Sequence, residues 1–282
     1  MSKVAVVTDS TANLPKNLIQ EYGIHVVPLK VIWGEEVLND GVDIMPTAFY
    51  ERLAASETMP TTSQVTVGEF SQLFGKLHAD GYEILAVLIS DALSGTIASA
   101  VQAKTDLPAA KIELVDSKST ITELAFQVLA GARVAQTGGS LADCKAAVEK
   151  ARENSGVVFA VDTMEFLHRG GRIGGGKRFL GTLLNIKPIL TVTDGKVDAL
   201  DQARTRKKAL ARLVEIVAER VAGKSNLRLG VSHANDPVEA QKFLEMASAQ
   251  LKPVETLVTE LSPAIGTHVG PGTLALAYLY ED

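Results

Sequence analysis

The sequence of 282 residues has almost no cysteine. Its single thiol, Cys144, lies inside a helical pattern, which excludes a disulfide framework and a thiolate metal cluster. The chain also has no apolar run of about 18 residues and no basic and apolar leader before its first strand. We therefore expect a cytoplasmic protein whose contact with a membrane is at most transient.

An excess of positive charge is missing as well. The formal net charge is -5 at pH 7, whereas nucleic acids and anionic membranes prefer a basic surface. The basic run from Arg204 to Lys208 is the local exception, and at the start of a helix it is typical of a solvated face. The five histidines are scattered, with no pair at metal-ligand spacing, so we expect no metal and no cofactor.

Apolar runs alternate with helical patterns through the first half of the chain. Buried strands are expected at residues 4–7, 85–90 and 111–115. The alternation predicts a mainly parallel sheet with helices on both faces, an α/β/α domain over residues 1–160. Pro28 interrupts a further strand at residues 24–33, and residues 59–64 are typical of a polar loop.

The pattern changes in the second half, for which we predict an α+β domain over residues 161–282. The dipeptide Asp194-Gly195 stands between two apolar runs, which predicts a β-hairpin. A helix at about 205–221 and a terminal strand at 273–280 follow, with His268 in a glycine-flanked loop before that strand.

The strand at residues 85–90 runs through Ser94-Gly95-Thr96 into helix formers. Hydroxyl donors, a glycine that lets a ligand approach, and the free amides of a first helical turn together suit one small anion. The alternative is an ordinary helix cap of serine and threonine without a ligand.

A glycine-rich stretch includes Gly171, Gly176 and Lys177, which fit the beginning of a nucleotide-binding loop. Arg178 stands where a serine or threonine should hold magnesium, and a short helix precedes the stretch instead of a strand, so we reject this interpretation. A basic loop that grips a phosphate or a partner protein is the better one; its cations are Arg169, Arg172, Lys177 and Arg178.

A serine hydrolase must also be considered, because Ser94 lies at a strand–helix junction. His268 could act as its base, with an aspartate to orient the ring: Asp9, Asp116 or Asp162. The hydrolase turn needs glycine two residues before the serine, where this chain has Ala92. The triad stays open at this point.

Several short motifs, taken in order from the first strand to the last loop, resemble those of the DegV family. They are Thr8-Asp-Ser-Thr11, Asp40-Gly41-Val42-Asp43, Pro60-Thr-Thr-Ser-Gln64, Leu93-Ser-Gly-Thr96, Val115-Asp-Ser117, Gly170-Gly-Arg-Ile173, Lys187-Pro-Ile-Leu190 and Gly266-Thr-His268. The resemblance covers nearly the whole chain. It implies a protein that binds a long-chain fatty acid and presents the carboxylate to a separate ATP-binding fatty acid kinase subunit, which makes an acyl phosphate.

The same resemblance implies roles for individual residues. Thr62, Ser94 and His268 would hold the carboxyl head. Ser63, Gly95 and Thr96 would surround it. Arg172 and Arg169 would face the kinase subunit, and no residue of this chain would be catalytic.

The chemistry of these residues agrees with that task, because a carboxylate in an apolar cavity needs several donors and its tail needs a dry channel. Such a channel favours a ligand enclosed between the two domains. Two alternatives remain, a serine esterase using Ser94 and His268, and a protein-interaction module acting through residues 169–178. Ala92, Ile97 and Ala98 depart from the family's more polar or aromatic choices, and we expect them to affect the preference for the tail.

Overall fold

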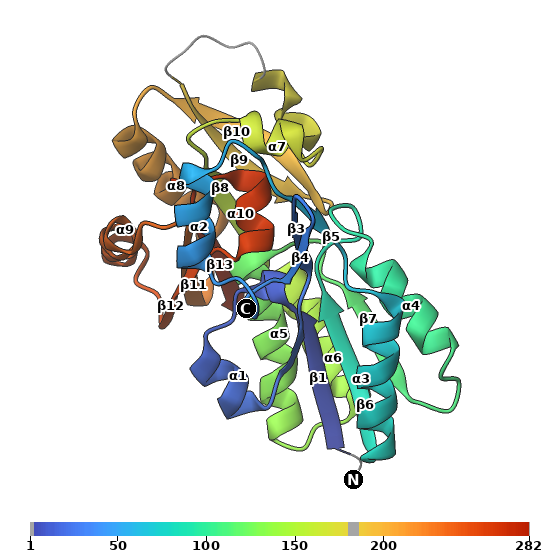
Figure 1. The fold of residues 1–282 in the computed structure, drawn as a ribbon. Coiled ribbons are helices and arrows are strands. Elements are labelled where there is room, and N and C mark those ends of the chain that lie inside the picture. Colours follow the sequence, from blue (N-terminus) through green and yellow to red (C-terminus); the bar gives the residue numbers. More distant parts are fainter. Residues whose placement is uncertain (1–2, 180–185, 282) are drawn as a thin grey trace.

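The computed structural model describes residues 3–179 and 186–281, which form three β-sheets with helices around them (Figure 1). The predicted mixed α/β class is confirmed. The strands are β1 (Lys3–Asp9), β2 (His25–Val27), β3 (Lys30–Trp33), β4 (Glu36–Asn39), β5 (Thr61–Ser63), β6 (Tyr82–Leu88), β7 (Ile112–Asp116), β8 (Ser155–Ala160), β9 (Lys187–Thr193), β10 (Lys196–Ala203), β11 (Ser225–His233), β12 (Glu255–Glu260) and β13 (Leu274–Glu281). The helices are α1 (Lys16–Tyr22), α2 (Pro46–Ala55), α3 (Val67–Ala79), α4 (Thr96–Thr105), α5 (Ile121–Gln136), α6 (Leu141–Glu153), α7 (Glu165–Arg169), α8 (Arg206–Arg220), α9 (Pro237–Leu251) and α10 (Pro263–Val269), with short 3-10 helices η1 (Ser10–Ala12) and η2 (Gly174–Phe179).

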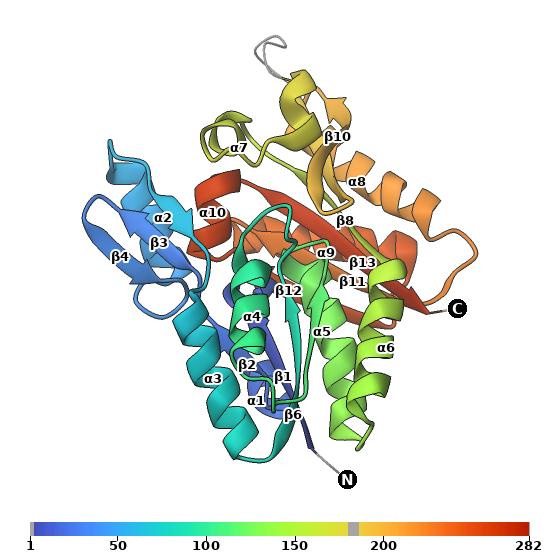
Figure 2. The same cartoon turned by 90° about the vertical axis from the view of Figure 1, so that its right-hand side faces the viewer.

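The first half of the chain builds a four-stranded parallel sheet in the order β2-β1-β6-β7. Side chains of its central strands alternate between two cores. Leu88 belongs to the core that contains Phe70 of α3, and Leu85 belongs to the core that contains Leu124 of α5. Figure 2 shows α3 and α4 on one side of these strands and α5 and α6 on the other. The predicted α/β/α arrangement is therefore present, because both faces of the strands are apolar.

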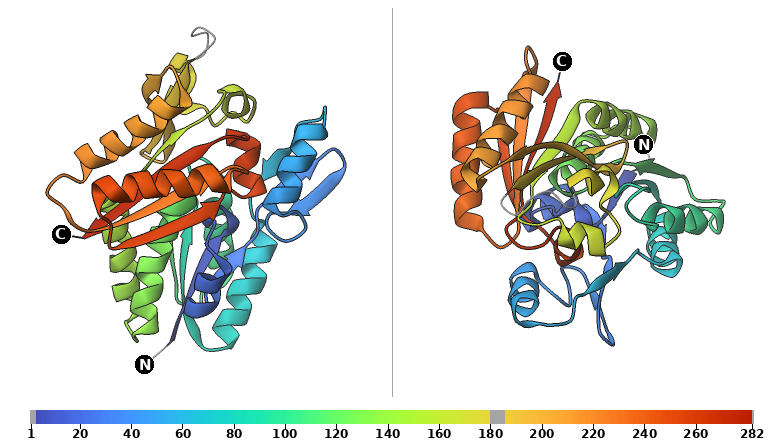
Figure 3. Two further views of the ribbon diagram at one scale, coloured as in Figure 1. Left: turned by 90° about the vertical axis from the view of Figure 1, so that its left-hand side faces the viewer. Right: turned by 90° about the horizontal axis from the view of Figure 1, so that it is seen from above.

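The second half builds a six-stranded sheet in the order β10-β9-β8-β13-β11-β12, antiparallel except for the β11–β12 pair. The predicted hairpin joins β9 to β10, and both Asp194 and Gly195 have positive φ, as a tight turn of this kind requires. Helices α8 and α9 pack on one face of this sheet through residues such as Leu213 and Phe243, and Figure 3 shows α9 lying across its outer side.

Strand β8 belongs to the second sheet. It pairs with β13 and β9, so the last residues of the segment 1–160 contribute to the core of the second half. The division of the chain into domains at residue 160 stays a prediction. The sheet pairing favours a boundary between α6 and β8.

The interruption expected at Pro28 is present, since β2 ends at Val27 and β3 begins at Lys30. The two strands belong to different sheets, because β2 pairs with β1 whereas β3 pairs with β4 and β5. Another local expectation was wrong. The expected loop at 59–64 contains β5, which pairs with β3 in the small sheet β4-β3-β5. A short polar strand at a sheet edge carries no apolar alternation, so the pattern did not reveal it.

Helix α5 connects the two larger sheets. It lies against β1 and β6 of the first sheet and against β8, β11 and β13 of the second. The Thr122 hydroxyl bonds the hydroxyl of Ser232, and it lies 3.1 Å from that of Thr259. A side chain at Gly230 would collide with Thr122, since an added Cβ would lie 2.1 Å from its Cγ2 atom. The start of α5 is therefore fixed in position.

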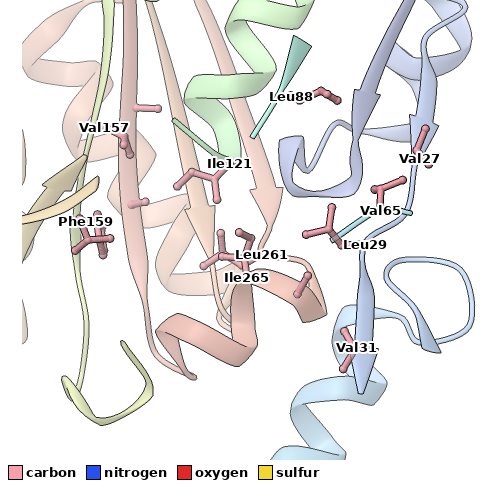
Figure 4. Packing of buried hydrophobic residues seen from close by; sticks show 14 of the residues in the cluster. Val27, Leu29, Val31, Val65, Leu88, Ile121, Val157, Phe159, Leu261 and Ile265 are labelled. Atoms are coloured by element: carbon pink, nitrogen blue, oxygen red, sulfur yellow. The ribbon is translucent and has the colours of Figure 1, made fainter. Parts of the chain in front are cut away.

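Apolar side chains from all three sheets converge near α10. Figure 4 shows Leu29 and Val65 on one side and Val157 and Phe159 of β8 on the other, with Ile265 of α10 between them. No helix within the described ranges is both long enough and apolar enough to cross a bilayer.

Candidate ligand cavity

A pocket lies where these apolar side chains converge; the space between its walls, with the open solvent at its mouth included, is about 870 Å³. Most of its wall is apolar; the residues are Leu29, Ile89, Leu93, Ile121, Val157, Phe159, Leu167, Val192, Val197, Leu261, Ala264, Ile265, Val269 and Ala275. The polar part of the wall consists of Thr11, Thr62, Ser63, Gln64, Ser94, Thr120, Arg172, His268 and Thr273.

Thr62 and His268 meet in this wall although 206 residues separate them, and Thr62 Oγ1 lies 2.7 Å from His268 Nε2. Thr62 is fixed because β5 pairs with β3. His268 lies in the last turn of α10, not in the loop that we expected. Pro263 begins that helix, and the helix packs so closely on α2 that a Cβ at Gly266 would lie 2.7 Å from Phe49.

The ring of His268 is largely buried. Burial is the main cause that lowers the pKa of His268 to about 4, and the positive charge of the neighbouring Arg172 is the second. The imidazole is thus neutral at pH 7. Its Nδ1 atom has no hydrogen-bond partner among residues 3–179 and 186–281, and the backbone of Gly170 lies directly against it.

Ser94 reaches the same cavity from the loop between β6 and α4. Its Oγ atom lies 2.9 Å from the Oγ1 atom of Thr96. Thr96 is completely buried and does not line the cavity, and Gly95 is exposed beside the side chain of Gln64. The N-cap residue of α4 is Gly95, which has no side chain to cap the helix, but the Ser94 hydroxyl accepts a hydrogen bond from the amide of Thr96 at 3.4 Å. The helix-cap alternative for Ser94 therefore stays open.

Arg172 lies in the cavity wall. Its Nε atom donates to the carbonyl of Leu93 at 3.1 Å, and its Nη1 atom donates to the carbonyl of Gly170 at 2.7 Å. The guanidinium therefore links the loop that carries Ser94 to the residue that touches His268. Arg169 is outside the cavity wall, exposed, and 2.6 Å from Glu165. The contact of either arginine with a partner stays a prediction.

The structure thus brings together four of the six residues predicted for the carboxylate. Thr62, Ser63, Ser94 and His268 share one cavity, and Gly95 and Thr96 lie behind Ser94. Ala92, Ile97 and Ala98 are not in the wall, so the expected direct effect on the tail has no support in these contacts.

Sequence reasoning missed Gln64, Thr11, Thr120 and Thr273 as wall residues. A positional signal was available for Thr120, since it follows β7 at the carboxyl edge of a parallel sheet, where ligands commonly bind. Thr11 had the same signal, since it follows β1 of that sheet, whereas Thr273 precedes an antiparallel strand and had none.

The hydrolase triad is not assembled. The three candidate orienting aspartates have other partners: Asp9 accepts from the amide of Ile89 at 2.7 Å, Asp116 from the amide of Lys118 at 2.8 Å, and Asp162 lies 2.7 Å from Lys187. The described residues also contain no group of three or more acidic, histidine or cysteine side chains that could hold a metal ion.

Comparison with known proteins identifies the family. A family described as "Uncharacterised protein, DegV family" matches residues 3–281. A DegV domain-containing protein of Clostridium perfringens is 37% identical over 99% of both chains, and the protein DegV of Bacillus subtilis is 32% identical, also over 99% of both. The chain belongs to the DegV family.

Solved structures show the same fold. A DegV family protein from Thermus thermophilus, described by its fatty acid binding, has a TM-score of 0.93 and 33% identity over 99% of this chain and 100% of its own. DegV from Bacillus subtilis, described as a fatty acid binding protein, has a TM-score of 0.90 and 32% identity over 100% of both chains. These relatives are fatty-acid-binding proteins.

Gly170→Ala should separate His268 from Thr62. The backbone of Gly170 has φ -73, which alanine accepts, but the new Cβ would lie 2.1 Å from His268 Nδ1. We expect the ring to move, with a changed side-chain ¹⁵N spectrum of His268 and a lower melting temperature. Gly75→Ala in α3 is the matched control, because nothing lies within 4 Å of its added Cβ. Identical His268 spectra in both variants would show that Gly170 does not set the ring position.

Proposed function

We propose that this protein binds one long-chain fatty acid in the cavity, with Thr62, Ser94 and His268 holding the carboxylate. The observation that carries the proposal is the meeting of these three side chains, from β5, the β6–α4 loop and α10, in an otherwise mostly apolar wall. The fatty acid binding of the relatives from Thermus thermophilus and Bacillus subtilis supports it.

The head group needs donors to replace its water. The hydroxyls of Thr62, Ser63 and Ser94 can donate, and so can one nitrogen of neutral His268. Gly95 and Thr96 complete the turn that positions Ser94. Arg172 lies in the same wall, but both of its hydrogen bonds go to backbone carbonyls, so we assign the head group to the hydroxyls and to His268.

The tail would lie along the apolar part of the wall. Each buried methylene contributes about 0.8 kcal/mol, so a chain of about 14 contributes on the order of 10 kcal/mol before ordering costs. A polar ligand of the same length would gain nothing from this wall. The cavity therefore favours a molecule with one acidic end and a long aliphatic chain.

We further propose that the chain is a carrier without catalytic residues of its own. In this proposal it presents the carboxylate to a separate ATP-binding fatty acid kinase subunit. A carboxylate oxygen would attack the γ-phosphorus of ATP, and the bond to ADP would break as the acyl phosphate forms. Arg172 and Arg169 would contact the partner, since both lie on the segment between β8 and β9 that borders the cavity.

Ser94→Ala should weaken palmitate binding about 10- to 100-fold, the effect of one hydrogen bond to a charged group. Isothermal titration of the delipidated protein measures it. Ser99→Ala in α4 is the matched control, because Ser99 lies outside the cavity wall and should leave the affinity unchanged. A parent protein that takes up neither palmitate nor oleate would contradict the proposed function, and ester hydrolysis abolished by Ser94→Ala would favour the esterase alternative.

Arg172→Ala should reduce acyl-phosphate formation tenfold or more with the kinase subunit, yet change palmitate affinity less than threefold. The reason is that both of its hydrogen bonds in the structure go to backbone carbonyls of the protein itself. Lys242→Ala, at an exposed position of α9, is the control and should alter neither quantity. A loss of palmitate affinity as large as the loss of acyl-phosphate formation would show that Arg172 binds the carboxylate. Unchanged acyl-phosphate formation would show that Arg172 does not contact the partner.

A further inference from the structure

Thr120 places an unused hydroxyl in the wall of the cavity. The residue is 9% exposed and stands directly before α5. Its Oγ1 atom is buried and has no hydrogen-bond partner in the part of the chain that the structure describes. A buried hydroxyl without a partner costs free energy, whereas a valine of the same shape would not. A partner is therefore expected from outside the chain.

The first turn of α5 adds to this polar spot. Thr120 is the N-cap residue of a helix of 16 residues, but its side chain accepts no hydrogen bond from the first turn. By contrast, Thr66 and Ser140 both cap the helices that follow them. The amides of a first turn have no partner within the helix and carry partial positive charge. The hydroxyl of Thr120 and the free amides at the start of α5 together favour a ligand oxygen that accepts hydrogen bonds.

The flanking residues hold the backbone of Thr120 in position. The carbonyl of Ser119 accepts a hydrogen bond from the amide of Ser90 at 2.9 Å. On the other side, Thr122 is held by Ser232 and Thr259. Ile121, which also lines the cavity, has φ 51, a left-handed conformation that is rare for a β-branched residue.

Thr120 is not hydrogen-bonded to the residues of the proposed head-group site. Within the described ranges no hydrogen bond joins it to Thr62, Ser94 or His268, and its neighbour Ile121 packs among apolar side chains near Leu261 (Figure 4).

We propose that Thr120 forms a polar subsite for an oxygen atom carried along the acyl chain, so that the protein prefers hydroxylated long-chain fatty acids to plain ones. This inference rests on the proposed function, because it concerns the tail of the same ligand. One net hydrogen bond corresponds to a preference of about three- to tenfold.

The test compares stearic acid with hydroxystearic acids that carry the hydroxyl near the carboxylate, at mid-chain or toward the methyl end. Isothermal titration should show at least one hydroxystearic acid binding three- to tenfold more tightly than stearic acid. Thr120→Val should abolish that preference without weakening stearic acid, and Thr120→Ser, which keeps the hydroxyl, should retain it. Thr62→Val is the head-group control and should weaken both kinds of acid by the same factor.

Three results would overturn the inference, and they are distinguishable. Equal affinities for all the acids in the parent protein would remove the subsite while leaving the proposed function intact. An equal loss for every acid in Thr120→Val would make Thr120 part of the head-group site. A parent protein that binds none of the acids would overturn the proposed function itself.

Discussion

A carboxylate can enter an apolar cavity only where hydrogen-bond donors replace the water around it. The contact between Thr62 and His268 places two polar side chains together in the cavity wall. The two residues come from a three-residue edge strand and from the last turn of a short helix. Neither element has a large core of its own. Each is held by packing against the rest of the molecule, so the site exists only when the whole chain is folded.

The cavity follows from how the sheets are joined. The parallel sheet supplies the turn with Ser94, the six-stranded sheet supplies the apolar residues of β8, and the small sheet supplies Thr62. Helix α5 packs against both larger sheets, and buried hydroxyls of Thr122, Ser232 and Thr259 fix it to the six-stranded one. Glycines permit the closest approaches, at Gly230 beside Thr122 and at Gly170 beside His268.

Periodicity predicted the elements whose signal is local. The buried strands β1 and β6, the helix α8 and the β9–β10 hairpin all carry their pattern within one segment. Strand β5 was not predicted, because Thr-Thr-Ser has no apolar alternation. The place of β8 in the second sheet was not predicted either, because its pairing with β13 joins residues far apart in the chain.

The residues of the candidate site were predicted from local position in one case and from the family resemblance in the others. Ser94 stood out by its place after a strand, whereas Thr62 and His268 were connected only through the resemblance to the DegV family. Nothing in the spacing of residues predicts that Arg172 lines the cavity, or that Thr120 leaves its hydroxyl without a partner. Such facts depend on side-chain directions that a pattern of residues does not contain.

The central claim, a carboxylate beside His268, is tested most directly by NMR titration of that histidine with and without palmitate. Burial lowers the pKa of His268 from 6.5 to about 4 in the free protein. A carboxylate next to the ring favours the imidazolium, so bound palmitate should raise this pKa, and affinity should increase as the pH falls through the raised value while the ligand stays ionised. The account predicts a midpoint near 4 without ligand and a clear rise toward 6.5 with it. A midpoint that does not move when palmitate is bound would contradict it.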